Sequence, residues 1–199
     1  DAPKGLAKEL GTKQGNSVHS ALFEYYTSEF YKQNNTFDLA VFKEMLAKQN
    51  LTPLEFEIWT HKFKEYEIYE NERLRAGFRV LECEKEVQSE FCGVQIKGFI
   101  DRIDVGTNGD VLILDYKTGE ANVNSLQLAF YEALYASEAR SAYYALKNEP
   151  SLLCPKKSVE DLNSEIEKLK TINKTKINFE RKSGACAFCE YVTLCRREL

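Results

Sequence analysis

Two aspartates and a lysine lie in a segment that otherwise has the pattern of buried β-structure. Asp115 and Lys117 follow the apolar run 111–114, and Asp101 belongs to the apolar segment before it. Ionisable side chains are seldom buried without a partner or a metal. Two adjacent carboxylates repel each other unless a proton or a cation lies between them, and hard oxygen ligands suit Mg²⁺ or Mn²⁺. With a lysine to orient water or stabilise phosphoryl charge, such a group is suited to hydrolysing a phosphodiester.

The length of the turn between the two segments decides whether the aspartates converge. Directly opposed residues of an antiparallel pair point to the same face. A two-residue turn would place Asp101 opposite Tyr116, on the wrong face, whereas a three-residue loop over 107–109 places it opposite Asp115. We therefore predict the three-residue loop, or a bulge of the same parity, with Gly109 in the left-handed conformation that such loops favour.

The same residues have a purely structural alternative. Asp115 and Lys117 could form a buried ion pair, with Asp101 paired to Arg102. Asp104 lies on the opposite strand face from Asp101, and we interpret it as a partner for Arg102 or for the turn. His61 has no motif around it and is interpreted as a surface residue.

The surrounding periodicity predicts a mixed α/β domain with helices packed on a central sheet. A helix at 52–75 is marked by a Thr52 N-cap, Pro53 at the first helical position and Glu55 completing a capping box. The last helix is capped by Ser158 with Asp161. The expected order is ααα-βββ-α-β-α: helices at 16–33, 37–49 and 52–75, strands at 79–91, 94–105 and 111–117, a helix at 125–137, a strand at 141–147 and a helix at 158–172.

Composition narrows the class of protein. The 199 residues suit one large domain, or one domain with an appendage, and a net charge of −4 argues against a surface that is basic throughout. No apolar run reaches the roughly 20 residues of a membrane helix, and no signal-like segment opens the chain, so we expect a cytoplasmic protein with no membrane partner. Because the chain begins at Asp1 without an initiator Met, we interpret it as a fragment of a longer protein.

Several motifs, in order, resemble a known family. The segments "GFIDRID", "LDYKTG" and "LQLAFYEALY" (126–135), preceded by "GNSVHSALFEYY" (15–26), resemble the PD-(D/E)XK nuclease superfamily, specifically the RecB and AddB exonuclease domains of bacterial recombinational-repair helicase-nucleases. The resemblance covers nearly the whole chain and is closest to a truncated AddB nuclease domain. It implies a restriction-endonuclease-like fold, with a nuclease domain over 1–182 (helical start 1–77, sheet core 78–147, final helix 158–172).

The resemblance also implies roles for individual residues. It implies a cation, Mg²⁺ or Mn²⁺, bound by His19, Asp101, Asp115 and the backbone carbonyl of Tyr116, with Lys117 as the catalytic lysine. Gln127 and Tyr131 match the family's Q-x-x-x-Y element, and their i, i+4 spacing places both on one helix face. From the residues alone, His19 could equally be a satisfied core histidine, and Tyr131 a core aromatic.

A glutamate on the first strand could support the metal shell. Glu84 in "LECEKEV" resembles the glutamate that many family members carry there. Glu86 shares its strand face, two residues on, and is the alternative.

The tail at 183–199 is rich in cysteine. Cys186, Cys189 and Cys195 have the spacing C-x₂-C-x₅-C, which in a cytosolic protein suggests a metal and not disulfides. This pattern resembles that of AddB-type nucleases. In those proteins three carboxyl-terminal cysteines bind a [4Fe-4S] cluster together with one cysteine upstream of the histidine helix. That cysteine is not in this chain, so we expect the cluster in the full-length parent and its absence or incompleteness here. Cys154 is the alternative fourth ligand, whereas Cys83 and Cys92 lie on predicted strands.

These features predict a metal-dependent DNA exonuclease domain. The resemblance implies a single-stranded DNA substrate, an AddA-like helicase partner and a role in double-strand-break repair by recombination. A CRISPR-associated nuclease with the same tail is one alternative. A catalytically idle scaffold or DNA-binding module is the other, but it would not need Asp101, Asp115 and Lys117 together.

Overall fold

The structure, a computed structural model, describes residues 4–135 and 139–171. The elements in these ranges are α1 Lys4–Thr27, α2 Glu29–Asn34, α3 Leu39–Leu46, α4 Pro53–Arg75, β1 Arg79–Phe91, β2 Val94–Val105, β3 Val111–Lys117, α5 Gln127–Tyr135, β4 Arg140–Ala145, β5 Ser151–Leu153 and α6 Val159–Thr171. The mixed α/β fold class is confirmed, and the bounds of β1, β2 and β3 agree with the predicted strands.

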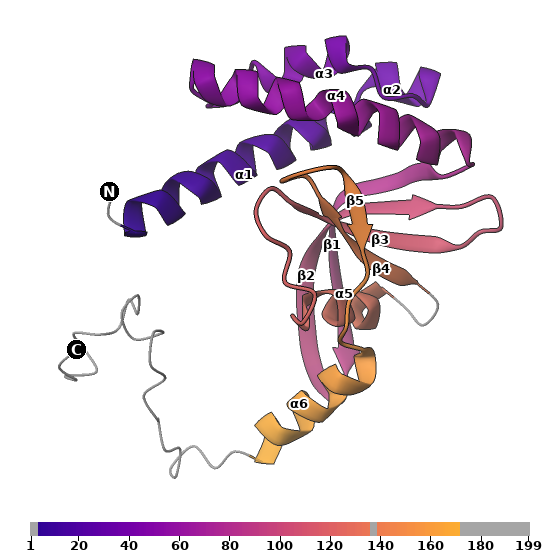
Figure 1. The fold of residues 1–199 in the computed structure, drawn as a ribbon. Coiled ribbons are helices and arrows are strands. Elements are labelled where there is room, and N and C mark those ends of the chain that lie inside the picture. Colours follow the sequence, from indigo (N-terminus) through magenta and orange to yellow (C-terminus); the bar gives the residue numbers. More distant parts are fainter. Residues whose placement is uncertain (1–3, 136–138, 172–199) are drawn as a thin grey trace.

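The five strands form one mixed sheet in sequence order. Strands β3 and β4 are parallel and joined through α5, and the other neighbours are antiparallel. In Figure 1 the helices α1 to α4 gather at one end of the sheet, and α5 lies lower, next to α6. Three apolar clusters occur in the described residues. The larger core packs α1, α3 and α4 against one sheet face, a second packs α5 against the other face, and a small third cluster joins α5 to α6.

Three local expectations differ from the structure. The helix predicted at 16–33 begins earlier and ends at Thr27, because the Ser28 hydroxyl accepts a hydrogen bond from the Tyr31 amide and starts α2 as its N-cap. The helix predicted at 37–49 is the shorter α3, capped by Asp38. The short strand β5, which follows β4, was not predicted.

The caps of α4 and α6 formed as predicted. Thr52 and Glu55 make both reciprocal hydrogen bonds of a capping box, with Pro53 in the first turn. The Ser158 amide donates to Asp161, whose own amide donates to the Ser158 hydroxyl. These local signals fix where α4 and α6 begin.

The loop between β2 and β3 has the predicted three residues. The Gly106 amide donates to the Asp110 carbonyl at 2.9 Å, closing residues 107–109, and Gly109 has φ +82°. The strands are then paired from Val105 with Val111 to Arg102 with Leu114. Asp101, the next residue of β2, accepts a hydrogen bond through its side chain from the Tyr116 amide, which directly follows Asp115.

The conformation of Gly109 gives a stability prediction. A Cβ at this position would meet no atom within 4 Å, so Gly109→Ala tests the backbone alone. We expect it to lower the free energy of unfolding by about 1–2 kcal/mol, because an L-residue is strained in the left-handed region. Gly119→Ala, where there is equal space and no positive φ, is the control and should change stability by less than about 0.5 kcal/mol. Equal effects in chemical denaturation would contradict the prediction.

Candidate active site

Asp101 lies where β2 meets α1 and β3. Its Oδ2 accepts a hydrogen bond from the Tyr116 amide at 2.8 Å and lies 3.3 Å from Nδ1 of His19. The His19 ring packs edge-on against the Tyr116 ring. A helix near the amino terminus and two strands some eighty residues later therefore meet at one carboxylate.

Glu84 on β1 completes a group of possible metal ligands. One ligand atom each from His19, Glu84 and Asp101 lies within 4.8 Å of the others, and no other such group occurs in the described ranges. They line a cavity of about 510 Å³ between α1 and β1. Glu84 has φ +48°, an uncommon conformation for a residue with a side chain, and strained residues cluster at functional sites. Glu84 and the alternative, Glu86, are both exposed, but Glu86 pairs with Lys97 and is not part of this group.

Asp115 and Lys117 lie next to this group, on the side of α5. The Lys117 ammonium is 2.5 Å from Oδ2 of Asp115 and donates to the Gln127 side-chain carbonyl at 3.0 Å. The Gln127 amide nitrogen donates to Oδ1 of Asp115 at 2.8 Å and to the Tyr131 hydroxyl at 3.0 Å. Gln127 is thus oriented by all three of its partners and in turn holds both charged groups.

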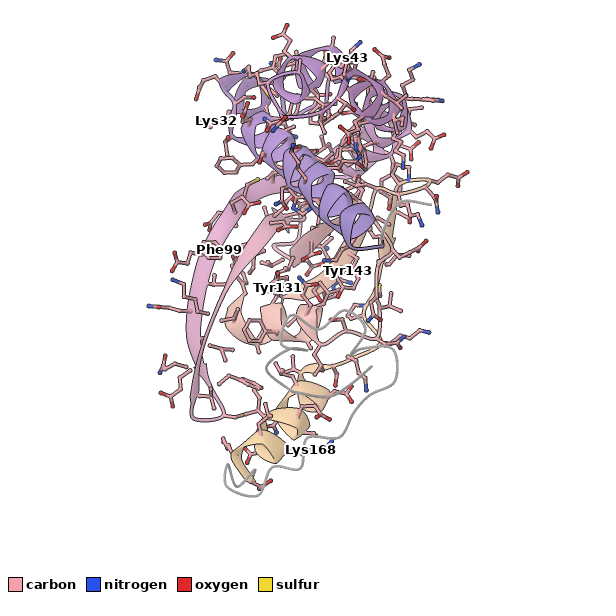
Figure 2. All side chains as sticks on the ribbon, turned by 90° about the vertical axis from the view of Figure 1, so that its left-hand side faces the viewer. Lys32, Lys43, Phe99, Tyr131, Tyr143 and Lys168 are labelled. Atoms are coloured by element: carbon pink, nitrogen blue, oxygen red, sulfur yellow. The ribbon has the colours of Figure 1, made fainter. Side chains whose placement is uncertain are left out.

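Aromatic side chains form the floor beneath Lys117. Its ammonium lies 5.0 Å from the centre of the Tyr143 ring on β4, which is paired with Asp115 across the parallel strands. Tyr131 and Tyr143 belong to the core beneath α5, and Figure 2 shows them near one another below the end of α1. Tyr131 therefore both packs in the core and contacts the site through its hydroxyl.

The electrostatics of the two groups are coupled. Burial, followed by Asp115 and Glu84, raises the pKa of Asp101 to about 8, against the opposing effects of the Tyr116 amide and Lys117. Burial also lowers the pKa of His19, so the imidazole is neutral at pH 7 and keeps a lone pair for a ligand. A bound cation would reduce the repulsion between the carboxyl groups of Asp101, Asp115 and Glu84.

These residues fit a divalent cation. The donor set joins carboxylate oxygens with a neutral imidazole, and the buried Oδ2 of Asp115 forms an ion pair with Lys117 but accepts no hydrogen bond from the described residues. His19, Glu84 and Asp101 would hold the ion, with Asp115 beside them. Glu84 was expected only to support the metal shell. Its carboxylate offers an oxygen within 4.8 Å of the ligand atoms of His19 and Asp101, so we place it among the residues that would bind the ion.

Cation binding should release a proton from Asp101. With its pKa raised from 3.8 to about 8, this carboxyl is protonated at pH 7 in the folded protein but ionised in the unfolded chain. The metal-free fold therefore loses stability as the pH rises through this window. Because a cation needs the carboxylate, Mn²⁺ affinity should increase from roughly pH 6 to pH 8, with about one proton released per ion. Calorimetry in buffers of different ionisation enthalpy measures that proton, and no release at pH 7 would contradict the prediction.

The structure also places Arg102, His61 and three of the cysteines. Arg102 does not pair with Asp101. It lies on the opposite sheet face and donates to Asp104 at 2.6 Å, as interpreted for Asp104. His61 is exposed, as expected. Cys186, Cys189 and Cys195 lie outside the described residues. Of the other cysteines, Cys83 and Cys92 are half-buried on or beside β1, and Cys154 is exposed.

Comparison with known proteins identifies the family. The model of the PD-(D/E)XK nuclease superfamily matches residues 3–196, nearly the whole chain. The chain belongs to the PD-(D/E)XK nuclease superfamily. Its class of activity is therefore that of a metal-dependent nuclease, and nucleases of this superfamily typically use Mg²⁺ or Mn²⁺. The cation-binding chemistry of the site agrees with this class.

Two solved structures are similar to this PD-(D/E)XK chain at low identity. One is the crystal structure of SSO0001, whose sequence is 18% identical to this chain. The match has a TM-score of 0.37 and covers 92% of this chain and 84% of that one. Protein VC1899 from Vibrio cholerae is 11% identical, with a TM-score of 0.30, over 82% of this chain and 47% of that one. No curated protein matches the chain significantly. Within the described residues, no helix is both long and apolar enough to span a membrane.

Proposed function

We propose that this PD-(D/E)XK nuclease is a DNA exonuclease domain that degrades single-stranded DNA in a helicase-nuclease complex of double-strand-break repair. The observation that supports catalysis most directly is the convergence of Asp101, Asp115 and Lys117 beside a neutral histidine. The order of the four RecB- and AddB-like motifs supports the finer assignment, because the same motifs supply the residues that meet at the site.

Each side chain has a defined task in the proposed reaction. A bound Mg²⁺ or Mn²⁺ would supply Lewis-acid polarisation of the phosphate and a water of lowered pKa. Lys117, which is partly exposed and whose ammonium lies over the Tyr143 ring, can donate to a phosphate oxygen as negative charge develops there. Gln127 keeps the ammonium from turning away. None of these groups reads a base, so we expect no sequence specificity.

The proposal is tested on DNA with and without free ends. Linear and circular single-stranded DNA are incubated with the protein and Mg²⁺ or Mn²⁺, with EDTA as the metal-free control. An exonuclease degrades the linear form and spares the circle, whereas cleavage of both would show an endonuclease. Asp115→Ala should remove digestion, and the exposed Asp110→Ala on the same hairpin should not. Binding of DNA without digestion under all conditions would support the idle scaffold instead.

The proposed partner and cluster need the longer protein. We expect an AddA-like helicase to copurify with the parent, and an extended chain containing an upstream cysteine to bind a [4Fe-4S] cluster through Cys186, Cys189 and Cys195. Such a cluster would join the chain ends and take no part in hydrolysis. Iron and sulfide analysis of the extended protein measures whether the cluster is bound. A Cys189→Ala variant, which lacks one proposed ligand, is the control.

A further inference from the structure

A network of buried charges lies directly behind the candidate site, on the other face of the sheet. Its centre is Arg102, which is fully buried and donates to Asp104 at 2.6 and 2.8 Å and to Glu70 of α4 at 2.5 Å. Arg73 of α4 donates to the same two carboxylates, at 3.1 Å to Glu70 and 2.9 Å to Asp104. Two guanidinium groups and two carboxylates thus neutralise one another inside the larger core.

Tyrosine hydroxyls extend this network to further elements. The Tyr116 hydroxyl on β3 accepts from Arg102 at 3.2 Å. The Tyr26 hydroxyl on α1 donates to Glu70 at 3.0 Å, and its ring lies 4.3 Å below the Arg102 guanidinium. The Tyr144 hydroxyl on β4 donates to the other Glu70 oxygen at 2.9 Å. The network therefore joins α1, α4, β2, β3 and β4.

The three elements that carry His19, Asp101 and Asp115 are each held by a close neighbour of that residue, whereas β1, which carries Glu84, is not part of the network. Arg102 directly follows Asp101 on β2, and Tyr116 directly follows Asp115 on β3. Tyr26 lies seven residues after His19 on α1, which is two helical turns and the same helix face. Alternate strand residues point to opposite faces, so the site and the network occupy the two sides of the same backbone segments.

The bonds between these neighbours restrict how the site can deform. Moving β3 along β2 would separate Arg102 from the Tyr116 hydroxyl, and rotating α1 would remove Tyr26 from Glu70. Each movement would leave a buried polar group without its partner, which is costly. An apolar core of the same volume would give comparable stability without fixing the elements to one arrangement.

We propose that Arg102 and Tyr116 are positioning residues, which through the Glu70 network hold Asp101 and Asp115 at the separation that a catalytic cation requires. This rests on the proposed function of the site but concerns residues that contact neither cation nor DNA. The Tyr116 side chain has this role in addition to the predicted role of its backbone carbonyl. Breaking the Arg102–Tyr116 bond, which directly joins the strands that carry Asp101 and Asp115, should therefore weaken cation binding before it affects contact with DNA.

The test compares two single hydroxyl deletions in the whole chain. Tyr116→Phe removes the acceptor that joins β3 to Arg102. Tyr144→Phe removes the hydroxyl of another buried tyrosine in the same network, on a strand without a predicted site residue. Mn²⁺ affinity is measured by calorimetry without DNA, and stability by chemical denaturation. We expect Tyr116→Phe to weaken Mn²⁺ binding roughly three- to tenfold, near the lower limit for outer-shell partners of a metal site, and Tyr144→Phe to leave it unchanged.

Digestion kinetics separate positioning from general damage. In Tyr116→Phe the Mg²⁺ concentration for half-maximal rate should rise by the same factor, while KM for DNA at saturating Mg²⁺ stays constant. Equal loss of Mn²⁺ affinity in both variants, or loss in neither, would overturn the inference. If the unmodified protein binds Mn²⁺ but digests no DNA, the proposed function fails while the affinities still decide the positioning role. If it binds no Mn²⁺, both fail.

Discussion

Glu70→Ala is expected to lower the free energy of unfolding by about 3–5 kcal/mol, the usual cost of removing one partner from a buried ion pair. Burial alone would raise the pKa of Glu70, but Arg102 and Arg73 outweigh it and hold the pKa below its ordinary value, so the carboxylate is charged. Without it, Asp104 is the only carboxylate left to the two buried guanidinium groups, the Tyr144 hydroxyl loses its acceptor, and the Tyr26 hydroxyl keeps only Tyr66 as a partner. Urea unfolding followed by circular dichroism measures the loss.

A neighbouring glutamate provides the matched control. Glu72 lies on the same helix and is exposed, so Glu72→Ala removes a similar side chain with almost the same change in helix propensity. We expect a change within about 0.5 kcal/mol. If the two variants were equally stable, the network would contribute no more to folding than a surface charge, and its place at the centre of the core would need another explanation.

Lys117→Ala is expected to slow DNA cleavage by about 10²–10³-fold, the effect of removing one donor that stabilises charge in a transition state. The side chain is 26% exposed and makes two polar contacts, to Asp115 and Gln127, so the fold should survive its removal. Single-turnover digestion at saturating cation isolates the chemical step from DNA binding and product release.

A second lysine tests whether the effect depends on position and not only on charge. Lys97 is exposed on β2 and pairs with Glu86, away from the site. Lys97→Ala changes the net charge by the same amount and should alter the rate less than about threefold, through weaker attraction of DNA. A loss in Lys97→Ala as large as that in Lys117→Ala would remove the case for a catalytic lysine, as would an unchanged rate in Lys117→Ala.

The sheet was predictable because its signals are local. The Asn108-Gly109 turn and the spacing of apolar residues were enough for the bounds of β1 to β3, whereas the loop of three residues was predicted from the requirement that Asp101 and Asp115 share a face. The capping box at Thr52 likewise depends on neighbours within one helical turn. Where a short stretch of chain contains the whole interaction, the sequence is sufficient.

Other parts depended on distant contacts. The segment 4–15 contains Gly5, Gly11 and Gly15, which weaken helix propensity, yet α1 extends through it. At Gly15 the helix approaches the Thr118 hydroxyl so closely that a Cβ would lie only 3.0 Å from it. A glycine that lowers helix propensity is thus used for close packing, and no local pattern distinguishes the two uses.

Part of the site was predictable because its residues are close together in the sequence. Asp101, Asp115 and Lys117 belong to one hairpin, and Gln127 and Tyr131 to one helix turn, so their proximity follows from strand and helix geometry. That Glu70 and Arg73 approach Arg102 could not be foreseen, because these charges on an amphipathic helix have the pattern of a solvent-exposed face. The only available signal was the i, i+3 spacing of opposite charges on α4, which exposed helices share.

The three-residue loop after β2 also constrains how this hairpin can diverge among relatives. Deleting or inserting one residue between Val105 and Val111 would shift the register by half a pleat and turn Asp101 to the face of the Arg102 network. Two residues gained or lost would restore the face. Insertions and deletions in this loop should therefore comprise two residues, or be accompanied by a bulge nearby. The residue types in the loop should vary freely, except at the position with the left-handed conformation.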